Sequence, residues 1–338
     1  MCIDCTINNS TGENEKMCKQ SCSNCGKCVR RPDYRSAFTL WDQQATVRKS
    51  PIRVLQEEQE KGKFFFPPSL IPATQHPLLI QRGRETMIKA TVYHLANYLD
   101  FTEVLEHQAV NQVAFDIARG RLGFALPPEM KADAYAIYVD EAYHAKFSAD
   151  LTRQVLAASR TPEIALPEPR FLKALEAATT ALPDPLKPLA RTFFVIVSET
   201  LITGVLTRVP HDESVVTVVR EVIADHAEDE RRHHAYFSQL LHALWPQLAE
   251  DHQQSLGQLI PDFILGFLNP DTDAVTKWLG AIGLSDLETK TVIAEAYSDA
   301  ATLEAARNAS KPTIRHCESS GLLNDSLIRD AFATKGLL

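Results

Sequence analysis

The chain has 338 residues, of which 45% are hydrophobic and 23% charged, and its formal net charge at pH 7 is −8. This composition is typical of a folded globular protein rather than a disordered one. The negative charge disfavours non-specific nucleic-acid binding, which needs a basic surface. Neither GxGxxG nor GxxxxGK[ST] occurs, so no motif supports a nucleotide-binding fold.

The chain begins with MCIDCTINNSTGENEK, which is polar and lacks the apolar segment of a signal peptide. Because there is no stretch of about 18 uncharged apolar residues, we expect no transmembrane helix and no membrane contact. Six of the seven cysteines lie within the first 28 residues. Clustered cysteines without a secretion signal favour thiols or a metal site in a reducing compartment, so we expect a cytoplasmic protein.

Residues 1–35 are predicted to form a cysteine-rich extension, separate from one larger domain over residues 36–338. Four of its cysteines have the spacing of metal ligands, and two more lie upstream: Cys18, Cys22, Cys25 and Cys28, with Cys2 and Cys5. Four thiolates could hold zinc or an iron–sulfur cluster. A reduced tail without metal stays open as the alternative.

From about residue 80 onward the hydrophobic pattern is helical, and residues 36–75 before it are expected to be irregular with one short helix. Proline and glycine residues mark several helix ends. The expected helices span residues 85–119, 129–158, 170–182, 189–208, 213–245, 251–268, 272–281, 285–308 and 312–320. No strand pattern appears, so the sequence predicts an all-α bundle with long core helices.

Two of these helices each carry the pair E-x-x-H. Glu141 and His144 share one face of the helix over residues 129–158 because they are three residues apart. Glu230 and His233 repeat this spacing on the helix over residues 213–245, where His226 shares their face. Chance gives roughly one such pair in this chain, so the pairs alone are weak evidence. A solvated face with incidental histidines is the alternative.

Buried carboxylates strengthen the metal interpretation. Glu199 lies in a segment that is apolar all round, and a bare buried carboxylate is costly unless a partner such as a cation satisfies it. On the helix over residues 85–119, the apolar stripe passes through both Glu103 and Glu106. Periodicity alone does not decide which of the two faces the core.

In chain order the four helices supply Glu, E-x-x-H, Glu and E-x-x-H, the arrangement of ferritin-like di-iron and di-manganese bundles. Four carboxylates offset the charge of two divalent cations, and imidazole suits iron, although the same ligands accept manganese. Asp140 and Asp229 directly precede the two E-x-x-H pairs. Each is either an acceptor that orients a ligand histidine or a surface residue.

Over roughly residues 70–325 the chain resembles the di-iron N-oxygenases typified by p-aminobenzoate N-oxygenase. The resemblance rests on His76-Pro77-Leu78, Thr102-Glu103, Asp140-Glu141-x-x-His144, Ser198-Glu199-Thr200 and His226-x-x-x-Glu230-x-x-His233. It implies a ferritin-like di-iron oxygenase domain, selects Glu103 over Glu106, and makes His226 a third histidine ligand. The implied metal ligands are Glu103, Glu141, His144, Glu199, His226, Glu230 and His233.

The resemblance also implies the activity. The protein would be an oxidoreductase that uses two iron ions and O2 to convert an amine to a hydroxylamine, and onward to nitroso or nitro, in secondary metabolism. The implied partners are a small-molecule amine and an external electron donor, and a homodimer stays open. The alternative is another ferritin-like di-iron oxidase, such as a hydroxylase or desaturase, or an iron-binding protein.

Overall fold

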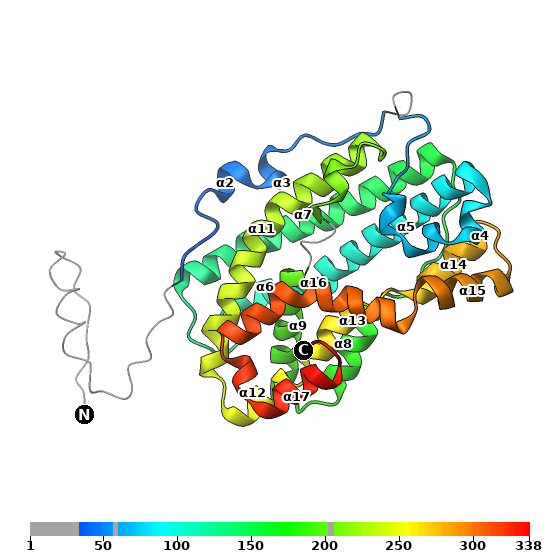
Figure 1. Ribbon diagram of the computed structural model, residues 1–338. Helices are drawn as coiled ribbons and strands as arrows, with labels where there is room; N and C mark the ends of the chain where they lie inside the picture. The colour runs from blue at the N-terminus through cyan, green and yellow to red at the C-terminus, as the bar shows by residue number, and fades with distance from the viewer. Residues whose placement is uncertain (1–33, 57–59, 202–205) are drawn as a thin grey trace, which may run out of the picture. The chain divides into compact units, whose positions relative to one another are not determined.

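The computed structural model describes residues 34–56, 60–201 and 206–338 (Figure 1). These residues form helices and short loops without any strand, and Phe64 and Val215 make an isolated parallel bridge. The predicted all-α, ferritin-like class is therefore confirmed. None of the described helices is long and apolar enough to cross a membrane. The cysteines of the predicted N-terminal extension lie outside the described residues, so that extension stays a prediction.

Four long helical segments form the centre of the bundle. They are α5–η4–α6, which runs without a break as α5 (Gly83–Leu105), the π-helical turn η4 (Glu106–Val110) and α6 (Asn111–Ala118), then α7 (Pro128–Ser159), α9 (Lys187–Leu201) and α11 (Thr217–Leu244). The first segment packs along α7, α9 packs along α11, and α7 also contacts α11. The four segments therefore enclose one common interior.

Local chemistry explains where the longest helix begins and ends. Pro128 occupies the first turn of α7, where no backbone N–H is needed. The helix ends at Arg160, whose φ of 52° lies in the left-handed region, directly before Thr161-Pro162. The helical conformation is disfavoured for the residue before a proline, which is Thr161 here, so the chain leaves the helix.

Shorter helices surround the four long segments. They are α2 (Trp41–Gln44), α3 (Thr46–Lys49), α4 (Pro77–Ile80), α8 (Arg170–Thr180), α12 (Glu250–Gly257), α13 (Ile260–Leu268), α14 (Thr272–Ala281), α15 (Asp286–Ala296), α16 (Asp299–Ser319) and α17 (Ser326–Thr334). Because α8, α13 and α16 all contact α9, every residue from 192 to 201 is buried. This burial confirms the prediction that Glu199 lies on a buried helix.

Some predicted boundaries in the C-terminal half are wrong. The helix expected over residues 251–268 is broken into α12 and α13. The expected break after residue 308 lies instead at Tyr297 and Ser298, and α16 continues through Pro312. Proline removes one helical hydrogen bond, but Ser310, Thr313 and Ile314 around it are buried. Tertiary packing of these neighbours retains the helix despite that loss.

The apolar interior is divided into two clusters along the bundle. On α7, Ile137 belongs to one cluster and Leu151 to the other. On α11, Ile223 and Tyr236 mark the same change. Between these positions both helices bury polar and charged side chains. The candidate site is this polar layer, which has an apolar core on either side.

Phe194→Ala is expected to lower the free energy of unfolding by about 3–5 kcal/mol, the usual cost of emptying a buried aromatic site. Phe194 is fully buried, and its ring stacks on Phe171 of α8 at 5.7 Å and meets Phe263 of α13 edge-on at 5.6 Å. Urea denaturation measures this loss. The matched control is Phe115→Ala, which changes a side chain 37% exposed and should cost much less.

Glu288 is expected to make the fold sensitive to acid. It closes a capping box with Ser285 at the start of α15 and accepts hydrogen bonds from Arg82 at 2.8 and 2.9 Å. The backbone and side chain of Ser285, and then Arg82, lower the pKa of Glu288 from 4.5 to about 2. Since the folded-state pKa is the lower one, this stabilisation is present above pH 4.5 and is lost as the pH falls towards about 2. Glu288→Gln should therefore flatten the decline of the thermal midpoint over that range.

Candidate metal centre

Six of the seven predicted ligands lie together in the polar layer, and none is more than 3% exposed: Glu141, His144, Glu199, His226, Glu230 and His233. With Glu106 they form three groups of potential metal ligands, within each of which the ligand atoms lie within 4.8 Å of one another. All four long helical segments contribute to this cluster. Their convergence is what a ferritin-like bundle requires of a two-cation site.

The first segment supplies Glu106, and not the expected Glu103. Glu106 is 1% exposed and belongs to two of the three groups, whereas Glu103 is only half-buried and belongs to none. Glu106 lies on the same helix face as the buried residues Leu99 and Thr102. Glu103, three residues earlier, points about 60° away from Glu106. The π-helical turn begins at Glu106, and such turns are frequent at functional sites.

Two glutamates lie between the histidines. Glu141 Oε2 is 2.8 Å from His144 Nδ1, and Glu141 Oε1 is 3.0 Å from His233 Nδ1. Glu230 Oε1 is 3.1 Å from His226 Nε2, 3.2 Å from His233 Nδ1 and 3.4 Å from His144 Nδ1. Both carboxylates can therefore be shared by two cations.

Each of the other two glutamates lies beside one histidine. Glu106 Oε1 is 3.9 Å from His226 Nε2, and Glu199 Oε2 is 3.9 Å from His233 Nδ1. Both oxygens of each of these carboxylates are buried, and the described residues give them no hydrogen-bond partner. A buried carboxylate without a partner is costly, so the arrangement fits a cation beside each of these two carboxylates.

The pKa shifts of the clustered side chains indicate the same need for positive charge. Burial, and then the neighbouring glutamates, raise the pKa of Glu106 and of Glu199 well above the usual range. Burial would lower the pKa of His144, but hydrogen bonds to Asp229 and Glu141 raise it to about 10. Protons thus stabilise the cluster when cations do not. Four carboxylates and three imidazoles are a donor set that suits iron or manganese.

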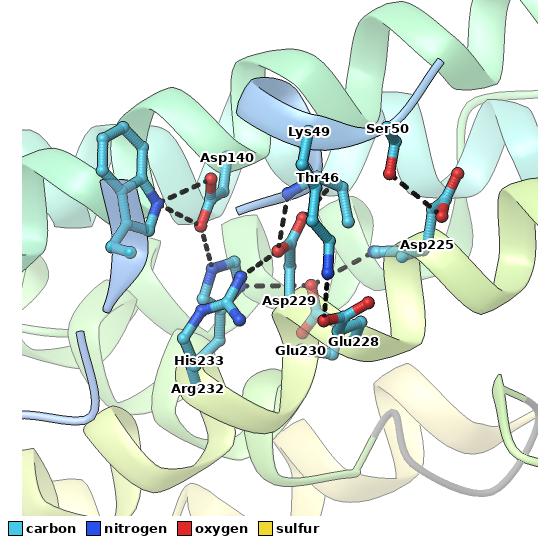
Figure 2. Close-up of polar contacts among 12 residues, drawn as sticks. Thr46, Lys49, Ser50, Asp140, Asp225, Glu228, Asp229, Glu230, Arg232 and His233 are labelled. Carbon is cyan, nitrogen blue, oxygen red and sulfur yellow. Dashed lines mark hydrogen bonds and ion pairs between the residues drawn. The ribbon is translucent and has the colours of Figure 1, made fainter. Parts of the chain in front are cut away.

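Two aspartates orient the histidines from outside the cluster. His144 Nε2 is 3.1 Å from Asp229 on α11. His233 Nε2 is 3.3 Å from Asp140 on α7 (Figure 2). Both aspartates are fully buried, which excludes the surface alternative. When Nε2–H donates to the aspartate, Nδ1 is left to face the cluster as a ligand atom. Each helix therefore orients the histidine of the other.

No feature of the sequence pointed to the residues that hold these aspartates. Trp41 Nε1 donates to both oxygens of Asp140 at 2.9 Å. The Thr46 backbone N–H donates to Asp229 at 3.2 Å, and the Thr46 hydroxyl and Arg232 donate to the same carboxylate. Trp41 and Thr46 lie in the segment that was expected to be irregular. No local pattern marks them, because the contacts cross 99 and 183 residues.

An all-α bundle that buries four glutamates and three histidines on its core helices defines the class of ferritin-like carboxylate proteins able to bind metal. The chain belongs to the family described as P-aminobenzoate N-oxygenase AurF, whose model matches residues 49–321. It is also similar to the 4-aminobenzoate N-oxygenase of Streptomyces thioluteus, with 21% identity over 230 residues, which are 66% of this chain and 67% of that protein. The resemblance noted in the sequence is confirmed, and the protein is an oxygenase, hence an oxidoreductase.

Proposed function

We propose that the protein is a di-iron N-oxygenase that uses O2 to convert a small-molecule amine to a hydroxylamine. The family supports N-oxygenation as the class of reaction. The observation that carries the metal part is the burial of Glu106 and Glu199 with no hydrogen-bond partner for either carboxylate among the described residues. The residues that would hold the ions are Glu106, Glu141, His144, Glu199, His226, Glu230 and His233.

The distances favour a division of these ligands between two ions. Glu106, His144 and His226 form a group with Glu230, and would hold one ion. Glu199 and His233, whose Oε2 and Nδ1 atoms are 3.9 Å apart, would hold the second ion. Glu141 and Glu230 contact histidines of both sets and would be shared. Replacing protons by two dications would remove the repulsion among the four carboxylates.

When bound, the two iron ions would activate O2, so that one of its oxygen atoms goes to the amine nitrogen while two electrons from an external donor and two protons reduce the other to water. The chain supplies a water-poor site, because no ligand is more than 3% exposed. The aspartates hold His144 and His233 with Nδ1 towards the cluster. The amine must arrive uncharged, since only a free lone pair on nitrogen can accept oxygen.

We place the amine in a cavity of about 250 Å³ that has Glu230 in its wall. Its lining combines four apolar residues with five polar or charged ones: Leu206, Pro210, Ala224 and Ala227, with Thr207, His211, Glu228, Glu230 and Arg231. Small-molecule sites combine apolar walls with polar groups that fix the orientation of the ligand. The cavity would bring the nitrogen next to a shared ligand of the centre.

Iron analysis and single-turnover chemistry on the full chain test this proposal. The protein is purified without O2, loaded with ferrous iron, and exposed to isotopically labelled O2 with 4-aminobenzoate as the first amine. We expect about two irons per chain and a labelled hydroxylamine detected by mass spectrometry. A variant in which Cys18, Cys22, Cys25 and Cys28 are replaced by serine controls for iron bound by thiolates.

The same assay separates the alternatives. Consumption of O2 that does not depend on the amine would indicate iron storage, and oxidation of carbon in the substrate would indicate a hydroxylase or desaturase. A folded protein that binds no iron in the variant with these four cysteines replaced would refute the di-iron assignment.

A further inference from the structure

Residues 38–50, which we call the N-terminal strap, include α2 and α3 and lie against α7 and α11 (Figure 1). Figure 2 shows that Thr46 of the strap reaches Asp229, next to Glu230 of the candidate centre. The strap therefore covers the side of the centre on which His144 and His233 contact the two aspartates.

Two parallel hydrogen-bonded chains connect the strap to the cluster. In one, Trp41 donates to Asp140, and Asp140 faces Nε2 of His233. In the other, Thr46 donates to Asp229, and Asp229 faces Nε2 of His144. Each chain ends on a different histidine, and the division of ligands proposed above assigns these two histidines to different ions.

We propose that Trp41 and Thr46 are positioning residues, one for each half of the metal centre, which fix the orientation of His233 and His144 through the aspartates. This inference rests on the proposed function. Both residues precede residue 49, where the match to the family begins. They are thus contributed by a part of the chain that the family resemblance does not cover.

The two halves are held unequally. Besides His144, Asp229 accepts from the Thr46 backbone N–H, the Thr46 hydroxyl and Arg232. Asp140 has Trp41 and His233 as its hydrogen-bond partners among the described residues. Loss of the Trp41 N–H therefore leaves Asp140 with His233 alone among the described residues, whereas loss of the Thr46 hydroxyl leaves Asp229 with two other donors besides His144. The effect of changing Trp41 is the larger one.

The strap remains docked when either residue is changed, because other contacts hold it. Phe38 stacks on the His233 ring with centroids 6.0 Å apart. Lys49 Nζ is 2.6 Å from Glu228, and Ser50 Oγ donates to Asp225 at 3.1 Å (Figure 2). Ser50→Ala is a matched control, since it removes a strap hydrogen bond that does not lead to a histidine.

The test is a titration of the metal-free full chain with Co²⁺, whose visible absorption reports its ligands and whose binding is measured without turnover. The parent and Ser50→Ala should bind two ions in the bundle. In Trp41→Phe one ion should bind about 10–100-fold more weakly, the usual cost of losing an outer partner of a ligand histidine. Thr46→Val should weaken the other ion by a smaller factor, and Thr46→Ser should restore it.

In each variant, the spectrum of the ion that still binds tightly identifies which of the two ions is weakened. Trp41→Phe and Thr46→Val should therefore leave different spectra. Equal binding of both ions by Trp41→Phe and the parent would overturn the inference, even if the thermal midpoint fell. A parent that binds no Co²⁺ and no iron would instead refute the proposed function, and the inference with it.

Discussion

Glu106→Gln is expected to remove at least one of the two metal ions and to abolish N-oxygenation, whereas Glu103→Gln should leave both ions and most of the activity. Glu106 is 1% exposed and both of its oxygens lack a partner among the described residues. Glu103 is half-buried and lies outside every potential ligand group. The neutral amide keeps the shape of the side chain but removes the charge that a cation needs.

Metal content and Co²⁺ affinity of the two variants, measured side by side, decide between the glutamates. The loss in Glu106→Gln should exceed the roughly 10–100-fold that removal of an outer partner costs. Both substitutions are the same chemical change on the same helical segment, so each controls for the other. Loss of metal in Glu103→Gln with normal binding in Glu106→Gln would show that the placement of this segment is wrong.

Glu199→Leu is expected to have opposite effects on the metal-free protein and on metal binding. The Glu199 side chain is buried in an apolar helix, and burial and the nearby Glu230 and Glu141 raise its pKa well above the usual range. Leucine of similar size removes an unsatisfied polar group. The free energy of unfolding of the metal-free protein should therefore rise, by about 1–3 kcal/mol.

The same variant should lose the ion next to His233 and the stability that the bound ion adds. Denaturant titrations with and without Co²⁺ measure both effects. Glu103→Leu, at a half-buried position outside the cluster, is the control and should not raise the stability of the metal-free protein. A destabilised metal-free Glu199→Leu would mean that the carboxylate has a structural partner rather than a metal to bind.

The raised stability expected of Glu199→Leu illustrates why the site conflicts with the fold around it. Four carboxylates in a layer between two apolar clusters oppose folding until cations or protons neutralise them. A core selected for stability alone would place leucine at such positions. The conflict therefore marks the polar layer as the functional part of the bundle.

Much of the candidate site could be predicted because its relations lie within single helices. Glu141 with His144, and Glu230 with His226 and His233, share a face by their spacing alone. The apolar surroundings of Glu199 predict its burial without knowledge of any neighbour. The all-α class follows in the same way from periodicity, which is a property of each segment by itself.

The relations between elements could not be predicted in this way. Periodicity allowed both Glu103 and Glu106, and the family resemblance selected the one that the structure places outside the cluster. The rotation of the segment against its neighbours decides this point, and the π-helical turn at Glu106 is part of that packing. Likewise a helix boundary was expected between residues 308 and 312, but the burial of the residues around Pro312 keeps α16 continuous.

The sequence by itself thus determined the helical class, the paired glutamate–histidine motifs and the buried Glu199, because each depends on residues a few positions apart. Only the tertiary structure decided that Glu106 enters the cluster, that Asp140 and Asp229 cross to the histidine of the opposite helix, and that Trp41 and Thr46 hold them. These contacts join residues 85 to 183 positions apart. Their geometry is fixed by how the helices pack, which no local spacing encodes.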